Sequence, residues 1–514
     1  MVFFVTRLTI AKGTTWGETA ALKIALITTL LFGLHPIQTE TVTYISGRPG
    51  GLAGLFYFSS LLLFILGSLK DCKVPRPIFY LISLASFFMA VLSKETAITL
   101  PAMIIIYDLC FMQGPDWSSF RSRLKFYLSF PALAGAAFLF SPHAFNTIEG
   151  FFHKFNYTFG LVQLDLLKYP LKLFLFPINL NFEYDFLAQV SWPSLLGSIA
   201  IVLLCVFLAL KKFYIKNSVL TFCVLWFPLT IAPTNSFMPR THLFSERNMY
   251  VPSFGLCLFL AVVLFLIGFK NKTRNGIWGT LLILFICTTF SALIVKRNQV
   301  YTSPSTLWAD TFKKSPNKLS VGKTLSIHYL MEEDYASALK PLQALLKINP
   351  NLYDVHQNIG IAQKSMGNFP KAEKHFKEAI RIEPREPSSH FNLASLYGNL
   401  GKFVQAIDEY EQADALYKST GKYHPPPFYS DKARAHNQAG IQLGQLKKFD
   451  EALIQFEKSV GLNPKSLEAR FNLAKLLLEF KKDRPAATIH LEQALKLNPI
   501  PSQIEVLQNL LKAQ

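Results

Sequence analysis

The stretch AALKIALITTLLFGLHPIQTETVTYISGRPGGLAGLFYFSSLLLFILGSL, residues 20–69, decides the fold class. Apolar residues dominate 20–35 and 50–69, and each run approaches the ~20 residues that an α-helix needs to cross a bilayer. The step between them, LHPIQTETVTYISGRP at 34–49, carries a histidine, a carboxylate and a guanidinium. A plain connection needs only turn-forming residues, so these three groups indicate a polar site between two membrane helices.

The same alternation of apolar runs and short polar steps continues to about residue 300. Of the 514 residues 51% are hydrophobic, and the mean hydropathy is +0.27. Further apolar segments cover 77–93, 95–112, 125–142, 157–177, 193–210, 217–234, 249–269 and 276–296. We therefore predict an all-α protein with a polytopic membrane domain over 1–300, a connector over 301–316 and a soluble helical domain after it.

The positive charge is concentrated in the membrane part. Residues 1–316 contain 26 Lys/Arg and 12 Asp/Glu, a net of +14, whereas residues 317–514 contain 26 and 21, a net of +5. Most of this excess fits the positive-inside rule, which places the basic loops on the cytoplasmic side: 70–76, 121–125, 211–216 and 270–274. The soluble half has no basic stripe, which argues against nucleic acid as a partner.

Counting crossings from these loops predicts which polar segments share the outer side. The count is consistent only if 141–192 crosses the membrane an even number of times. We therefore expect 157–177, which contains three charged residues and Pro170, not to span as one helix. The outer side then holds the soluble domain and four polar segments: 35–48, 93–95, 181–185 and 235–247.

The soluble half repeats with a period of 34 or 35 residues. Four triplets end in proline, at 348–350, 382–384, 462–464 and 497–499. An alanine stands twelve positions before each proline: Ala338, Ala372, Ala452 and Ala487. A bulky residue stands eight positions before each proline: Leu342, Phe376, Phe456 and Leu491. This spacing is typical of tetratricopeptide helix pairs. We predict five repeats over 317–500, a loop of ~12 extra residues near 415–430, and a capping helix over 501–514.

The first helix of the repeats carries an amide side chain at one recurring position: Asn358, Asn392, Gln438 and Asn472. First helices line the concave face of such solenoids, so this ladder could hydrogen-bond an extended polypeptide. The alternative is an ordinary solvated surface. A second recurring position holds three histidines, which we assign to the scaffold because equivalent residues lie ~10 Å apart, too far for one metal ion: His356, His390 and His436. The six cysteines lie in or beside apolar segments and show no metal-ligand spacing.

Four stretches in chain order resemble a known family: LHPIQTETVTYISGRPGGLAGLF, SKETAITLP, NLNFEYDF and SERNMYVPS. They are similar to signature stretches of the transmembrane and tetratricopeptide repeat-containing O-mannosyltransferases and their bacterial relatives, and SPSTLWADTFKKSPN resembles the family's bridge into the repeats. The resemblance implies a GT-C glycosyltransferase that moves a sugar, mannose in this family, from a polyprenyl-phosphate carrier to protein Ser/Thr hydroxyls on the outer face. It implies no cofactor, and leaves a divalent metal open. We expect a multi-pass protein of a bacterial inner membrane with periplasmic repeats, or of the endoplasmic reticulum membrane in a eukaryote.

One departure from the family pattern concerns the catalytic base. The chain begins at MVFFVTRL, which is similar to the family's second membrane helix, so we expect the first helix and its acidic outer loop to be missing. No carboxylate takes the base's role by motif, and five on the outer side are candidates: Glu40, Glu95, Glu183, Asp185 and Glu246. The alternative function is a membrane-anchored interaction scaffold without catalytic activity.

The donor chemistry calls for fixed cations, because negative charge develops on a lipid phosphate when the sugar leaves. Arg48 and Arg247 are the first candidates, since a guanidinium can hold two phosphate oxygens, and we expect them to converge on one anion. The alternative for Arg48 is a side chain that extends to lipid headgroups. Lys94 and Arg240 are two further candidate phosphate ligands. His35 and Tyr250 are predicted to line the site.

Overall fold

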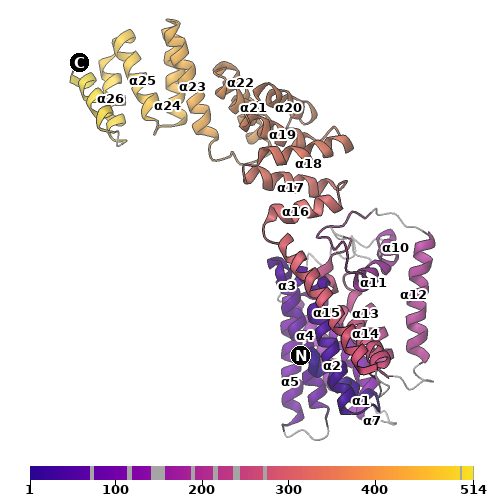
Figure 1. The fold of residues 1–514 in the computed structure, drawn as a ribbon. Helices are drawn as coiled ribbons and strands as arrows, with labels where there is room; N and C mark the ends of the chain where they lie inside the picture. Colours follow the sequence, from indigo (N-terminus) through magenta and orange to yellow (C-terminus); the bar gives the residue numbers. More distant parts are fainter. Residues whose placement is uncertain are drawn as a thin grey trace. The chain divides into compact units, whose positions relative to one another are not determined.

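The computed structural model describes residues 1–69, 74–112, 118–139, 157–186, 192–211, 218–235, 243–269, 275–497 and 500–512. The chain divides into two compact units, Met1–Pro316 and Asn317–Gln514. Every regular element in the described ranges is helical (Figure 1). The predicted all-α class, apolar helices followed by a solenoid of helix pairs, is confirmed.

The first unit consists mainly of long apolar helices. Their bounds are α1 Val2–Gly13, α2 Glu18–Leu34, η1 Pro36–Gln38, α3 Thr39–Thr43, η2 Ile45–Gly47, α4 Arg48–Gly67, α5 Arg76–Ser93, η3 Glu95–Thr99, α6 Leu100–Tyr107, η4 Asp108–Met112, α7 Ser118–Ser122, α8 Leu124–Leu139, α10 Tyr157–Asp165, α11 Lys168–Leu175, α12 Trp192–Lys211, α13 Ser218–Ile231, η5 Glu246–Met249, α14 Ser253–Gly268, α15 Asn275–Val300 and α16 Pro304–Lys314. Within the described residues four helical stretches are long and apolar enough to cross a membrane, and a fifth if α2 and the bent segment after it form one span. The chain is therefore a membrane protein.

The polar step of the opening stretch is a folded turn inside this unit. α2 ends at Leu34, and the segment Pro36–Thr43 continues at an angle of 51° to it. Pro36 lacks the amide that a continuing helix needs. The buried His35 fixes the bend, because its Nδ1 accepts the amide hydrogen of Ile37 at 3.2 Å and its Nε2 donates to the carbonyl of Phe174 at 2.8 Å.

The segment 157–177 contains two short helices, α10 and α11, of 9 and 8 residues. Neither is long enough to cross a bilayer. The prediction that this segment does not span as a single helix is therefore confirmed. Within the first unit, Figure 1 places α3, α10 and α11 at one end of the long helices and α7 at the other.

The second unit stacks antiparallel helix pairs in chain order. Their bounds are α17 Leu319–Met331, α18 Tyr335–Ile348, α19 Tyr353–Ser365, α20 Phe369–Ile382, α21 Pro387–Asn399, α22 Phe403–Thr420, α23 Phe428–Gln445, α24 Phe449–Leu462, α25 Leu467–Leu476 with the π-helix η6 Leu477–Lys481, α26 Arg484–Leu495 and a last helix α27 Pro501–Lys512. The repeat alanines are fully buried, as is Phe376. A Cβ at Gly360 would overlap the Phe376 ring, so the small residue lets the two helices of the pair touch.

The predicted loop near 415–430 is mostly helical, which corrects that part of the sequence analysis. The extra residues lengthen α22 and α23 to 18 residues each, and only 421–427 connect them. Apolar residues explain the difference. Tyr417 and Phe428 are buried in the same cluster as Tyr410, so both extensions add to the core.

Candidate functional site

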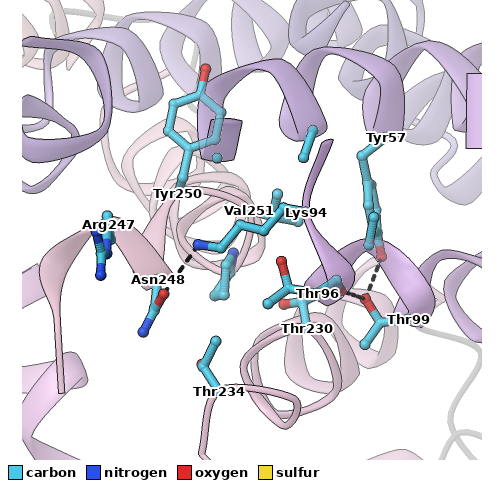
Figure 2. Close-up of a pocket in the computed structure, with 14 residues that line it drawn as sticks. Tyr57, Lys94, Thr96, Thr99, Thr230, Thr234, Arg247, Asn248, Tyr250 and Val251 are labelled. Carbon is cyan, nitrogen blue, oxygen red and sulfur yellow. Dashed lines mark hydrogen bonds between the residues drawn. The ribbon is translucent and has the colours of Figure 1, made fainter. Parts of the chain in front are cut away.

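A polar cavity of about 460 Å³ lies where the start of α4, the α5–η3 junction and η5 come together. We call it the front cavity. Its lining includes Gly50, Lys94, Glu95, Arg247 and Asn248. A narrower pocket shares four of these residues and continues toward α13 and α14; Figure 2 shows its polar lining, Thr96, Thr99, Thr230 and Thr234, together with Tyr57 and Tyr250. Four of the predicted site residues line these two pockets: Lys94, Glu95, Arg247 and Tyr250.

The side chains of Lys94 and Asn248 are in contact on the wall of the front cavity. The Nζ of Lys94 donates to the Oδ1 of Asn248 at 3.2 Å, and this contact is drawn in Figure 2. The glycines of α4 leave room for them. A Cβ at Gly50 would lie 3.7 Å from that Nζ, and one at Gly54 would overlap the ring of Tyr250. The small residues in GRPGGLAGL thus let the lysine and the tyrosine pack against the helix.

Glu40 holds the η5 turn beside the front cavity. Its buried carboxylate accepts hydrogen bonds from the Ser245 hydroxyl at 2.9 Å and from the backbone amide of Arg247 at 3.0 Å. The guanidinium Nε of Arg247 lies 3.9 Å from the same carboxylate. Glu40 therefore contacts both the backbone amide and the guanidinium of Arg247.

Glu246 anchors the other side of η5. The carboxylate is fully buried and accepts hydrogen bonds from the amide of Asn181 and the hydroxyl of Tyr184. Arg297 lies 3.6 Å away and also pairs with Asp310 at 3.0 Å. Burial raises the pKa of Glu246 to about 7, against the opposing effect of the Arg297 charge.

This pKa makes the stability of the first unit dependent on pH. The folded chain binds the Glu246 proton more tightly than the unfolded chain, so Glu246 loses stabilisation as the pH rises from its ordinary pKa of 4.5 through about 7. We expect the melting temperature of the detergent-purified chain to fall between pH 5 and pH 8, and Glu246→Gln to flatten that fall. Equal pH dependence in both proteins would show that Glu246 carries no such linkage.

The other predicted site residues lie elsewhere. Arg48 is exposed and is not part of the lining of either pocket, although its chain neighbours Gly47 and Pro49 line the front cavity. Asp185 lines a separate cavity, and Glu183 is buried on the segment that follows α11. His35 caps the bend of α2 instead of lining the front cavity. Arg240 lies outside the described residues.

Sequence reasoning missed Asn248, the four threonines and Arg297. Asn248 and Thr96 stand inside the quoted stretches SERNMYVPS and SKETAITLP, but uncharged polar residues were not selected. Arg297 directly follows the apolar segment 276–296, where a charge at membrane depth is costly and marks a partner. The position of Arg297 at the end of an apolar segment could therefore have indicated a buried ion pair, and its partner in that pair is Glu246.

In the repeats, the amide ladder divides into two halves. Asn358 and Asn392 are partly exposed, and neither side chain has a hydrogen-bond partner among the described residues. Gln438 and Asn472 instead bond to neighbouring helices, through Glu468 and Asn437. Gln438 and Asn472 therefore each use one amide hydrogen within the repeats, whereas Asn358 and Asn392 have the whole amide available to a ligand.

The repeat histidines pair with the second helix of their repeats. His356 contacts His375 at 3.0 Å, His390 contacts Glu409 at 2.7 Å and His436 contacts Gln455 at 2.7 Å. These contacts fit the scaffold assignment. In the described part of the chain no group of three or more His, Cys, Asp or Glu could hold a metal ion.

Family models described as tetratricopeptide repeat match residues 353–386 and 387–420. Protein O-mannosyl-transferase F38B6.6 of Caenorhabditis elegans is 24% identical over 62% of this chain and 46% of its own length. Protein O-mannosyl-transferase TMTC1 of Homo sapiens is 25% identical over 62% of this chain and 40% of its own length. The chain thus spans less than half the length of these curated relatives.

Solved structures similar to this chain include YrrB, described as a TPR protein with an unusual peptide-binding site. It is 16% identical, with a TM-score of 0.31, over 41% of this chain and all of that one. A MamA double mutant is 17% identical, with a TM-score of 0.28, over 35% of this chain and 93% of that one. Together with the quoted motifs, these matches show that the chain is similar to the transmembrane and tetratricopeptide repeat-containing protein O-mannosyl-transferases.

Proposed function

We propose that this chain transfers mannose from a polyprenyl-phosphate carrier to Ser/Thr hydroxyls of a polypeptide. The transfer takes place on the outer face of the membrane, and the repeats present the acceptor polypeptide. The relatives named as protein O-mannosyl-transferases support the reaction class. The observation that carries the proposal is the front cavity, where Lys94, Arg247 and Asn248 surround one space at the ends of apolar helices.

The cavity suits the departure of a lipid phosphate. During transfer the bond between the anomeric carbon and the phosphate oxygen breaks, and the acceptor hydroxyl oxygen bonds to that carbon. The released phosphate gains negative charge, which the Lys94 ammonium and the Arg247 guanidinium would stabilise. Glu40 holds Arg247 in place through the backbone amide and the guanidinium.

The acceptor hydroxyl must lose its proton to a base. Among the five carboxylates predicted for the outer side, Glu95 lines the front cavity, next to Lys94. Glu40 and Glu246 are buried and accept hydrogen bonds from neighbouring residues. We therefore assign the proton-accepting role to Glu95 in this chain.

Binding of polyprenyl phosphate to the purified full chain in detergent tests the site. We expect Lys94→Met to weaken binding at least tenfold, because it removes one of the two cations of the cavity. The matched control is Lys125→Met, at an exposed lysine of α8 that lies outside both described parts of the site. Equal affinities of wild type and Lys94→Met for polyprenyl phosphate would show that the front cavity does not bind the phosphate.

A scaffold without catalytic activity is the second candidate function. The family-model matches favour it, because they cover only repeats, and repeats of this kind bind peptides or proteins. A chain that binds polypeptide but no polyprenyl phosphate would support the scaffold. Binding of both supports the transferase.

For the repeats, we propose that Asn358 and Asn392 hydrogen-bond the backbone of an extended polypeptide. Changing both to alanine is expected to weaken the binding of a Ser/Thr-rich peptide by about tenfold, since each net hydrogen bond contributes ~0.5–1.5 kcal/mol. Fluorescence anisotropy with the full chain measures this. The control is Asn351→Ala with Asn399→Ala, two exposed asparagines outside the ladder. Equal loss in both double variants would identify the ladder as ordinary surface.

A further inference from the structure

A second, larger cavity has Arg297 in its lining and shares no lining residue with the front cavity. We call it the rear cavity. Its volume is about 690 Å³, and residues of α15, α16 and the segment after α11 line it. The buried Arg297 and Asn181 are part of this lining. Each of them has a buried polar atom without a hydrogen-bond partner, Nε of Arg297 and Oδ1 of Asn181.

The rear cavity carries an excess of positive charge. Four cations line it, Lys296, Arg297, Lys313 and Lys314, against two carboxylates, Asp185 and Asp310. Asp310 already pairs with Arg297 and Lys314. Lys296 and Lys313 are exposed and form no ion pair with any described residue. The two lysines are therefore available to an anion.

The position of these lysines is not explained by the positive-inside rule. The basic loop at 270–274 precedes α15, and Lys296 stands near the other end of the same helix. One membrane helix thus has cations at both ends, whereas the rule accounts for one end only. A ligand on the side of the rear cavity accounts for the other.

The rim of the rear cavity is apolar and exposed. Ile178 lines the cavity and is 62% exposed, and Leu175 and Phe176 beside it are 63% and 64% exposed. On α15 the large side chains Trp278, Leu281 and Phe285 are exposed as well, as expected for a helix that faces lipid. Cations above an apolar rim match a lipid whose headgroup is anionic and whose chains lie below it.

We propose that the rear cavity binds the headgroup of an anionic phospholipid, with Lys296 and Lys313 as the phosphate-binding cations. Leu175, Phe176 and Ile178 contact its acyl chains. The site is separate from the front cavity and does not depend on the transfer reaction. The lipid would hold α15, α16 and the segment after α11 together at the membrane surface.

Affinity of the full chain for phosphatidylglycerol, measured by native mass spectrometry from detergent, tests this proposal. We expect Lys296→Gln with Lys313→Gln to weaken binding of the tightest phosphatidylglycerol about thirtyfold, since each lysine near an anionic surface contributes about fivefold. Lys296→Arg with Lys313→Arg should bind like wild type, because the charge is kept. The control is Lys347→Gln with Lys465→Gln, two exposed lysines of the repeats.

Three results would overturn the proposal. The first is equal binding of phosphatidylglycerol by wild type and the Lys296/Lys313 glutamine variant, and the second is an equal loss in the Lys347/Lys465 control. The third is binding of inorganic phosphate or of phosphatidylcholine as tight as that of phosphatidylglycerol. Mannose transfer in the glutamine variant is a separate readout, so failure of the lipid site and failure of the transferase remain distinguishable.

Discussion

Replacing Arg247 with glutamine is expected to lower the rate of mannose transfer by about 10²–10³-fold. Removing one preorganised donor from developing negative charge typically has an effect of this size. The structure supports such a donor, because Arg247 lines both described parts of the site and Glu40 holds its backbone amide at 3.0 Å. Arg247→Lys should recover only part of the rate, since an ammonium cannot make the two-pronged contact of a guanidinium.

A control variant and a stability measurement test whether the loss of transfer is specific to Arg247. Arg121→Gln changes an exposed arginine on α7, at the opposite end of the first unit, and should transfer mannose at the wild-type rate (Figure 1). The melting temperature of Arg247→Gln should stay close to that of wild type, because the side chain is 36% exposed and its pairing with Glu40 spans 3.9 Å. A wild-type transfer rate in Arg247→Gln would exclude this residue from the phosphate site.

Replacing Arg297 with methionine is expected to destabilise the first unit by about 3–5 kcal/mol, because removal of one partner leaves a buried charge unpaired. Arg297 is 5% exposed and lies 3.6 Å from the fully buried Glu246. Without the guanidinium, the hydrogen bonds that remain to the carboxylate among the described residues come from Asn181 and Tyr184. Denaturant or thermal unfolding of the purified chain in detergent measures the loss.

An exposed pair of the same type serves as the control. Arg7 and Glu18 are 41% and 53% exposed, so Arg7→Met should change the unfolding free energy by only ~0–1 kcal/mol. The double variant Arg297→Met with Glu246→Gln should regain part of the stability, because it no longer buries an unpaired charge. If Arg297→Met were as stable as Arg7→Met, the buried pair would have no structural role.

Sequence patterns predicted the fold closely wherever one physical rule dominates. Apolar runs of bilayer length identified the membrane helices, and the spacing of Ala372 and Phe376 identified the helix pairs. The bend at His35 and Pro36 follows from the missing proline amide. We predicted a loop between the third and fourth repeats because that stretch is rich in proline. The prediction was wrong, because Tyr417 and Phe428 are buried there and extend the core.

The site was predicted less completely, because charge and position along the chain do not determine which side chains meet. Arg48 and Arg247 both stand beside polar turns, yet only Arg247 lines the front cavity. Glu40 pairs with Arg247 across 207 residues of sequence. Such a contact depends on how α3 packs against η5, and a single sequence contains no signal for it.

Mannose transfer by the purified chain is the most direct test of the proposed function. The detergent-solubilised protein is incubated with polyprenyl-phosphate mannose and a Ser/Thr-rich peptide, and the peptide is analysed by mass spectrometry. We expect wild type to add one hexose to a hydroxyl, and Lys94→Met and Arg247→Gln to abolish most of that product. A wild-type chain that binds the peptide but leaves it unmodified would contradict the transferase and favour the scaffold.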